Sequence, residues 1–456
     1  MLEIFQAENR EKLYTLTILM LPVLGTQLAN MGMGFFDASM SGQAGNMDLA
    51  GAAIGSNTWA PIHTGIGGIL MAATPLIANA LGAGDKEKIT SMLLQGMLLG
   101  LLFGLLIIGA GFLGLPLFLG QMSLSPEVYE IAFWYCTGVS LGIIPLFLTV
   151  PLRCLIDTLG HTDLTMKLYL VGLPINALLN YILIFGKLGL PRMGGVGAGF
   201  ATGITYWVLF LLFAFTSFKV NEFKRYFPLV GKNEVKNRAA VNLEQIKEYL
   251  RIGIPMGFSI FLEVAVFCVV AFFMAKFGTD TIAAHQAAMN MACLVYMIPL
   301  SFSMALTIVV GIEYGAKRFE GAKLYGKLGI QLSVLVAFVY LVLEYFGRGP
   351  ISYIYSSDEH VRSLLHQFIV YAIVWQCGDA IAAPIQGILR GYKDVDATFW
   401  ASVLAYWGIC LPVGLLMDFK FNMGPFAYWQ SLALGVICSA IILVLRLKWV
   451  QKRIAN

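Results

Sequence analysis

Charged residues are scarce in this sequence. Asp, Glu, Lys and Arg make up 12% of its 456 residues, about half their share in an ordinary soluble domain. They gather between long apolar runs, and the mean hydropathy is +0.77. A helix needs about 20 apolar residues to cross a bilayer, and these runs are solidly apolar rather than alternating as in a membrane barrel. The composition therefore predicts an all-α integral membrane protein.

The signatures of several other protein classes are also absent. The seven cysteines are scattered without a CxxC pair, so neither a disulfide framework nor a zinc site is indicated. There is no Walker A loop, no HExxH and no GxSxG, which argues against ATP hydrolysis and covalent catalysis. The net charge of +4 reflects basic loops rather than a nucleic-acid surface. We expect a protein that is not an enzyme, has no cofactor and binds no nucleic acid.

What the sequence does contain is twelve apolar blocks, separated by charged or Gly/Pro-rich breaks. Most Lys and Arg residues fall in the loops that share one side of the membrane with the two ends of the chain. The positive-inside rule then places both termini in the cytoplasm, as expected for a multi-pass protein of the plasma (inner) membrane. The predicted spans are 13–36, 50–80, 92–118, 129–150, 165–185, 195–217, 251–275, 282–311, 325–346, 363–386, 397–418 and 425–446.

The second half of the chain repeats the first at one constant offset, without gaps. Pro22 falls on Pro255, and Pro151 falls on Pro384. Each copy holds six spans, an even number, so we expect two lobes related by a pseudo-two-fold axis along the membrane normal. The predicted domains are an N-terminal six-helix lobe (1–218), a cytoplasmic linker (219–250) and a C-terminal six-helix lobe (251–456).

Two carboxylates fall deep within predicted spans. Glu263 lies 12 residues after Arg251, about 18 Å along a helix, with no basic residue within a turn or two in the sequence. Asp379 lies almost five helical turns after Arg362, and we expect it near mid-depth too. A carboxylate at the bilayer centre costs about 2.5–3.5 kcal/mol on insertion scales, so it usually faces a polar cavity. The alternatives are a protonated glutamate bonded to a neighbouring helix, and a span that ends early at Gly378.

A third carboxylate, Asp37, has a depth that geometry alone leaves open. It lies about 25 residues after Lys12, about 38 Å of helix, which reaches the outer edge of an untilted span. It therefore either meets water at a helix end or stays inside a span that bends and continues. The ten residues after it carry no charge, which favours the second interpretation.

Polar residues of spans 5 and 6 are candidates to accompany these carboxylates. Asn176 and Asn180 are four residues apart and share one helix face, and Thr202 lies in the next span. Taken alone, each is more typical of a helix–helix hydrogen bond than of a ligand site.

With these residues in view, the chain resembles a multidrug and toxic compound extrusion (MATE) transporter of the NorM type. The resemblance covers nearly the whole chain, from its length and its two six-span repeats to its long central loop. The segments that carry it are LPVLGTQLANMGMGFFDASMSG, ATPLIANALGAGD, PINALLNYILIFG, GIPMGFSIFLEVAVF and QGILRGYKD.

The resemblance assigns roles to the carboxylates. Asp37 matches the N-lobe carboxylate of the family, and the resemblance implies that Asn176, Asn180 and Thr202 are its polar neighbours. An aspartate occupies the place of Asn180 in the DinF-type branch, so a purely DinF-like proton site is not expected.

The resemblance also implies a second site, in the C-lobe. Glu263 and Asp379 match the cation site of the NorM branch, which makes them the expected ligands of a coupling Na⁺. Trp375 stands where that branch often has a tyrosine. Because an indole offers no hydroxyl oxygen, we expect Trp375 to support the substrate or cation without ligating it.

The function implied by the resemblance is secondary active multidrug efflux. A monomer embedded in the lipid bilayer would export organic cations and amphiphilic drugs by antiport with Na⁺ or H⁺, alternating access between its two lobes. One alternative is a lipid-linked oligosaccharide flippase of the same broader superfamily, which would need basic residues in its cavity. Another is a membrane-embedded enzyme, which would need a clustered catalytic motif.

Overall fold

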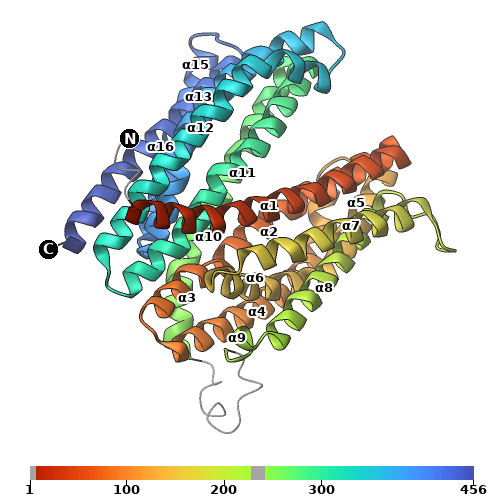
Figure 1. Ribbon diagram of the computed structural model, residues 1–456. Helices are drawn as coiled ribbons and strands as arrows, with labels where there is room; N and C mark the ends of the chain where they lie inside the picture. Colours follow the sequence, from red (N-terminus) through yellow and green to blue (C-terminus); the bar gives the residue numbers. More distant parts are fainter. Residues whose placement is uncertain (1–6, 227–241, 456) are drawn as a thin grey trace. The chain divides into compact units, whose positions relative to one another are not determined.

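The computed structural model describes residues 7–226 and 242–455, and within these ranges the regular structure is helical, without a β-strand (Figure 1). Two short segments depart from α-helical geometry: η2 is a 3₁₀ turn and η3 is π-helical. The elements are α1 (Ala7–Ala44), α2 (Asn46–Leu70), α3 (Ala73–Gly82), α4 (Lys86–Gly120), α5 (Pro126–Ser140), α6 (Ile143–Thr158), α7 (Thr162–Phe185), α8 (Gly195–Lys219), α9 (Asn221–Lys224), α10 (Leu243–Met274), η2 (Ala275–Phe277), α11 (Thr279–Gly315), α12 (Phe319–Tyr355), α13 (Glu359–Gly391), α14 (Val395–Ser402), η3 (Val403–Cys410), α15 (Leu411–Phe419) and α16 (Phe426–Ala455).

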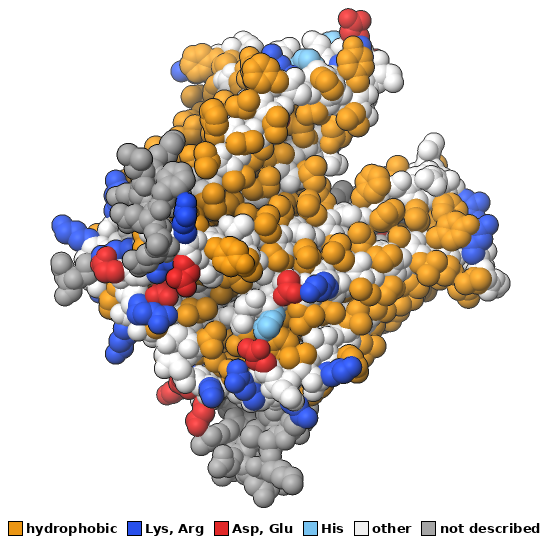
Figure 2. Space-filling view, viewed as in Figure 1, with side chains coloured by type: hydrophobic (Ala, Val, Ile, Leu, Met, Phe, Trp, Pro, Cys, Tyr) orange, Lys and Arg blue, Asp and Glu red, His pale blue; other side chains and the backbone are white. Residues whose placement is uncertain are grey.

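The helices have the length and hydropathy of membrane spans. Eleven helical segments of the described chain qualify, and α5 with α6, bent by 46° at their junction, form a twelfth. Large apolar side chains remain on the surface: Phe112, Phe346 and Phe272 are 83%, 78% and 77% exposed. In the view of Figure 2, hydrophobic side chains cover the flanks of the helices and charged ones gather near helix ends. The all-α integral membrane fold with twelve spans is confirmed.

Several helices run past the predicted ends of their spans. α1 continues to Ala44 rather than to 36, and α12 continues to Tyr355 rather than to 346. Hydropathy marks the part of a helix that matches the hydrocarbon layer, whereas the backbone can stay helical beyond it. Asp37 and Glu344 therefore lie inside helices and not at their ends.

The described chain forms two compact units. The N-terminal unit is Pro22–Gly257, and the C-terminal unit is Phe258–Asn456 together with Met1–Leu21. The chain changes unit within α1 and within α10, close to the repeat-related Pro22 and Pro255, which both lie inside these helices. A proline inside a helix removes a backbone hydrogen bond and favours a bend.

The predicted linker is only partly described. Residues 227–241 lie outside the described residues, whereas 219–226 complete α8 and form α9, and 243–250 begin α10. The predicted domain boundaries stay a prediction.

In the N-terminal unit, α8 packs against α5, α6 and α7 (Figure 1). Its crossing with α5 depends on glycine, because a Cβ at Gly203 would overlap the carbonyl oxygen of Gly138. Small residues allow two membrane helices to approach this closely. The C-terminal half of α1 contacts α7 and α8 through hydrogen bonds to Asp37.

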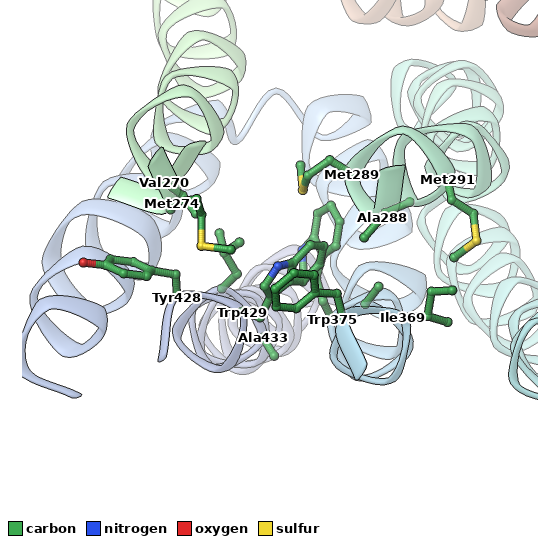
Figure 3. Packing of buried hydrophobic residues seen from close by; sticks show 14 of the residues in the cluster. Val270, Met274, Ala288, Met289, Met291, Ile369, Trp375, Tyr428, Trp429 and Ala433 are labelled. Atoms are coloured by element: carbon green, nitrogen blue, oxygen red, sulfur yellow. The ribbon is translucent and has the colours of Figure 1, made fainter. Parts of the chain in front are cut away.

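In the C-terminal unit, α13 packs against α11, α12 and α16. Of the most apolar stretch of α13, 67% is buried, compared with 28% for α12. Figure 3 shows the apolar core on one side of α13, where Trp375, Trp429 and Tyr428 gather with methionines of α10 and α11. Gln376, Asp379, Gln386 and Arg390 of α13 are all buried inside the unit.

Candidate functional site

Asp37 is held by three helices of the N-terminal unit. Asn180 Nδ2, on α7, donates to its Oδ1 at 2.5 Å, and Thr202 Oγ1, on α8, donates to its Oδ2 at 2.8 Å. Asp37 lies seven residues before the end of α1, so the interpretation as a helix-end residue is wrong. The structure brings together the carboxylate and two of its three predicted companions.

A second layer of hydrogen bonds fixes these donors. Asn180 Nδ2 also donates to Asn176 Oδ1 at 3.1 Å, and Asn176 Nδ2 donates to Thr205 Oγ1 at 3.4 Å. Asn176, Asn180 and Thr205 are at most 1% exposed. Thr205 was missed in the sequence, although it lies one turn after Thr202 on the same helix.

The side chains that hydrogen-bond to Asp37 are uncharged. Asp37 takes part in no ion pair among the described residues, and its hydrogen-bond donors carry no charge. Asn180 Oδ1 is buried without a hydrogen-bond partner in this part of the chain. The site thus offers a negative charge and a spare oxygen, which suits a cation.

A pocket lies at the C-terminal part of α1, lined by residues next in sequence to Asp37 and Asn180. Its volume is about 510 Å³, within the range of small-molecule sites. Four aromatic rings dominate its wall, and two basic side chains also line it. The lining residues are Phe35, Phe36, Ser39, Met40, Gln43, Tyr181, Phe185, Lys187 and Arg192.

Glu263, on α10 in the C-terminal unit, has neutral donors as well. Gln386 Nε2 and Ser402 Oγ each donate to its Oε1 at 3.1 Å. Ser402 is the last residue of α14, immediately before the π-helical η3. π-Helical turns are frequent at functional sites, because the extra residue re-aims neighbouring side chains. Neither donor was predicted from the sequence.

A buried arginine joins this cluster. Arg390 Nη2 donates to Gln386 Oε1 at 3.4 Å, Arg390 is 5% exposed, and its charge acts on Glu263. The prediction that Glu263 has no basic neighbour holds along α10 only, because Arg390 arrives from α13.

The internal repeat indicated that polar groups occur at these two positions. Gln386 and Arg390 fall on Arg153 and Asp157 of the first copy, which form an ion pair in α6 with Arg153 Nε 3.3 Å from Asp157 Oδ2. The same two positions therefore hold buried polar groups in both units. In the first copy the arginine is neutralised within its own helix, whereas in the second copy it stands beside Glu263.

Asp379 is close enough to Glu263 to be affected by its charge, but no hydrogen bond joins the two side chains in the described chain. Asp379 is 6% exposed, and the charge of Glu263 acts on it. Among the described residues its Oδ2 is buried without a hydrogen-bond partner. It lies well inside α13, which continues to Gly391, so the alternative that the span ends early at Gly378 is wrong. A Na⁺ ion at Glu263 and Asp379 stays a prediction.

Trp375 is part of the apolar core on α13. It is 3% exposed and packs edge-to-face against Phe267, with ring centroids 5.3 Å apart. It lies one turn before Asp379 and provides an apolar wall there. Its predicted support of a substrate or cation stays a prediction.

Comparison with known proteins bears on the whole chain. The MatE family model matches residues 22–182 and again 255–416, and the two starting positions are those that the internal repeat aligns. The chain is 44% identical over 444 residues to the probable multidrug resistance protein NorM of Halalkalibacterium halodurans, covering 97% of this chain and 96% of that protein. It is 43% identical over 444 residues to the protein of the same name in Bacillus subtilis, covering 97% of each.

Solved structures match the fold over the same extent. A eukaryotic MATE transporter superposes with a TM-score of 0.83 at 19% identity, covering 97% of this chain and 99% of that one. A point mutant of a MATE transporter of Vibrio cholerae superposes with a TM-score of 0.87 at 19% identity, covering 98% of this chain and 99% of that one. Two matches to one family model, full-length relatives and a shared fold agree, and the chain belongs to the MatE family.

Proposed function

We propose that this protein is a secondary active multidrug exporter, which expels organic cations and amphiphilic drugs in exchange for Na⁺ or H⁺. The observation that carries the proposal is Asp37, a carboxylate inside a span whose donors Asn180 and Thr202 are neutral. Curated relatives that match 97% of the chain are named multidrug resistance proteins, which supports the substrate class.

The chemistry around Asp37 suits an amphiphilic cation. The pocket at the C-terminal part of α1 offers four aromatic rings, which can pack on apolar drug surfaces, and Lys187 and Arg192 also line it. Lys187 Nζ lies 5.9 Å from the centre of the Tyr181 ring, so the rings of Phe35, Phe36 and Phe185 are the ones left for a bound cation. Aromatic faces attract cations with about 0.5–2 kcal/mol each. Because Asp37 lacks a cationic partner in the described chain, a bound cation would supply the missing charge.

The C-terminal cluster has the charge balance of a coupling site. Glu263 and Asp379 carry two negative charges when ionised, and Arg390 carries one positive charge. One Na⁺ ion or one proton would neutralise the remaining charge. Carboxylate oxygens are ligands that hard cations prefer. We therefore propose that the coupling cation binds at this cluster and that the substrate binds near Asp37.

The proposal includes the placement of the protein. It lies in the plasma (inner) membrane as a monomer, with both termini in the cytoplasm, as the basic loops favour. Export would then move substrate from the cytoplasmic side to the outer side by alternating access.

The other two hypotheses are weaker. A lipid-linked oligosaccharide flippase would need uncompensated basic residues to hold a pyrophosphate. Arg153 instead pairs with Asp157, and the charge of Arg390 acts on Glu263. A membrane-embedded enzyme would need a catalytic motif, and none was found in the sequence.

An accumulation assay tests the proposal. Cells that express the protein should accumulate less ethidium and less of a fluoroquinolone than cells that express the Asp37→Asn variant at the same level. Equal accumulation across a broad panel of organic cations would contradict export.

A further inference from the structure

A third buried carboxylate of the C-terminal unit lies outside the cluster around Glu263. Glu344 is on α12, and Gln376 Nε2, on α13, donates to its Oε1 at 3.3 Å. Glu344 and Gln376 are 6% and 2% exposed. The phenol of Tyr340, one turn before Glu344, is acted on by the charges of both Glu344 and Asp379. Tyr340 therefore lies within the electrostatic influence of both carboxylates.

These side chains leave oxygen atoms unused. Among the described residues, four buried oxygens have no hydrogen-bond partner: Glu344 Oε2, Gln376 Oε1, Tyr340 Oη and Asp379 Oδ2. An unpaired buried polar group costs about 1–3 kcal/mol, and a bound cation or water molecule would satisfy these oxygens. Oxygens of this kind coordinate a small cation, and a carboxylate oxygen can also take a proton.

No positive charge balances Glu344 in the described chain. The nearest basic residue along α12 is Arg348, whose guanidinium carbon lies 4.2 Å from the ring centre of Tyr345, and among the described residues no ion pair joins it to Glu344. The remaining titratable neighbour is Cys377, on α13. Glu344 lies three helical turns before the end of α12 at Tyr355, about 16 Å along the helix, so an uncompensated charge there would be costly.

The internal repeat argues against a purely structural role. At the offset that aligns the two copies, the first copy has only apolar residues and glycine in place of this trio. The six-helix scaffold therefore forms without these polar groups. The matched pairs are Tyr340 with Ile107, Glu344 with Gly111 and Gln376 with Ile143.

The polar groups form an ordered series between α12 and α13. Nearest the connection between the helices, Ser352 Oγ and His366 Nε2 lie 3.1 Å apart. Glu344 with Gln376 comes next, and Tyr340 and Asp379 lie one turn deeper along their helices. Eight residues, about 12 Å of helix, separate Ser352 from Glu344, so the Ser352–His366 pair stands apart from the polar group at Glu344.

We propose that Glu344, together with Gln376 and Tyr340, is a second site for the coupling cation, Na⁺ or a proton, through which that cation passes to and from Asp379. This inference rests on the proposed cation-coupled export. Glu344, Gln376 and Tyr340 supply oxygens without a partner in the described chain, and Tyr340 lies one helical turn from Glu344 on the side of α12 toward the deeper level of Asp379.

The test uses proteoliposomes of the full chain with ethidium as substrate. Glu344→Gln keeps the size of the side chain and an oxygen for the hydrogen bond from Gln376, but removes the charge. Efflux is measured against Na⁺ concentration at fixed pH in one arm, and against proton concentration without Na⁺ in the other. The half-saturating concentration of the driving cation should rise about tenfold, because an attractive charge is lost, while the maximal rate stays within a few fold. The arm that shows the shift identifies the cation.

Matched variants separate a relay from a structural role. Glu344→Asp should restore most of the affinity for the cation, and Tyr340→Phe should give a smaller shift in the same direction. Glu320→Gln removes a carboxylate whose side chain is 85% exposed on the same helix, and it should change nothing.

Two outcomes would overturn the inference. If a cation drives wild-type efflux but the half-saturating concentration is unchanged in Glu344→Gln, this site is refuted and the proposed function stands. If Glu344→Gln does not fold, the half-saturating concentration in Tyr340→Phe provides the same test. Wild-type efflux that depends on neither cation would refute the proposed function and this inference together.

Discussion

Replacing Asp37 by asparagine separates the charge of this side chain from its hydrogen bonds. The new amide can keep one oxygen toward Asn180 Nδ2 and turn its NH₂ group toward Thr202 Oγ1, the two partners that now lie at 2.5 and 2.8 Å. The number of hydrogen bonds is therefore unchanged. Because the charge assistance that is lost is offset by the easier burial of a neutral group, the free energy of unfolding should change by about 1 kcal/mol or less.

The effect of the same substitution on a bound cation is much larger. A unit charge about 4 Å from the carboxylate gains about 4 kcal/mol at an effective dielectric constant of about 20. That corresponds to roughly a thousandfold in affinity. Asp37→Asn should therefore fold normally and lose transport of cationic substrates.

Two assays measure these effects. Thermal unfolding of the purified variant in detergent reports stability, and ethidium efflux from proteoliposomes reports transport. Asp163→Asn is the matched control, because Asp163 is a half-exposed aspartate paired with Lys167 at 2.6 Å, and it should leave efflux intact. Wild-type efflux in a folded Asp37→Asn variant would refute the assigned role of this carboxylate.

The remaining predictions concern the C-terminal unit. Glu263→Gln and Asp379→Asn should each abolish cation-driven efflux while the purified protein stays monodisperse, and full activity in both would show that coupling occurs elsewhere. Arg390→Met should lower stability, because the charge of Arg390 acts on Glu263 and its hydrogen bond to Gln386 is lost, and thermal unfolding should show partial recovery when Glu263→Gln is added. Gly387→Ala should cost about 1–3 kcal/mol, because a Cβ there would overlap a backbone carbonyl of α11, whereas Gly349→Ala, with open space around it, should unfold at the wild-type temperature.

The spans were predictable from sequence because hydropathy responds directly to the bilayer. Twelve apolar blocks predicted twelve spans, and the structure has them. The helix ends were not predictable in the same way. α12 continues nine residues beyond its predicted end at 346, since a helix can extend into the interface, where hydropathy is lower. The predicted end at 346 put Glu344 near a span boundary, whereas the helix places it three turns before its end.

The site was predictable where its residues share a helix face or a family motif. Asn176 and Asn180 lie four residues apart, and the structure joins them to each other and joins Asn180 to Asp37. The surroundings of Glu263 depend instead on how helices cross. Gln386 and Ser402 reach its carboxylate from two other segments, and no spacing along a single chain encodes such a meeting.

The most direct test of the central claim is efflux from proteoliposomes with one imposed gradient at a time. Purified wild-type protein, loaded with ethidium on its cytoplasmic side, should expel the dye faster when either Na⁺ or H⁺ is higher on the opposite side, and it should stop when that gradient is collapsed. Efflux at the same rate with and without both gradients, or no efflux under any gradient, would contradict cation-coupled export.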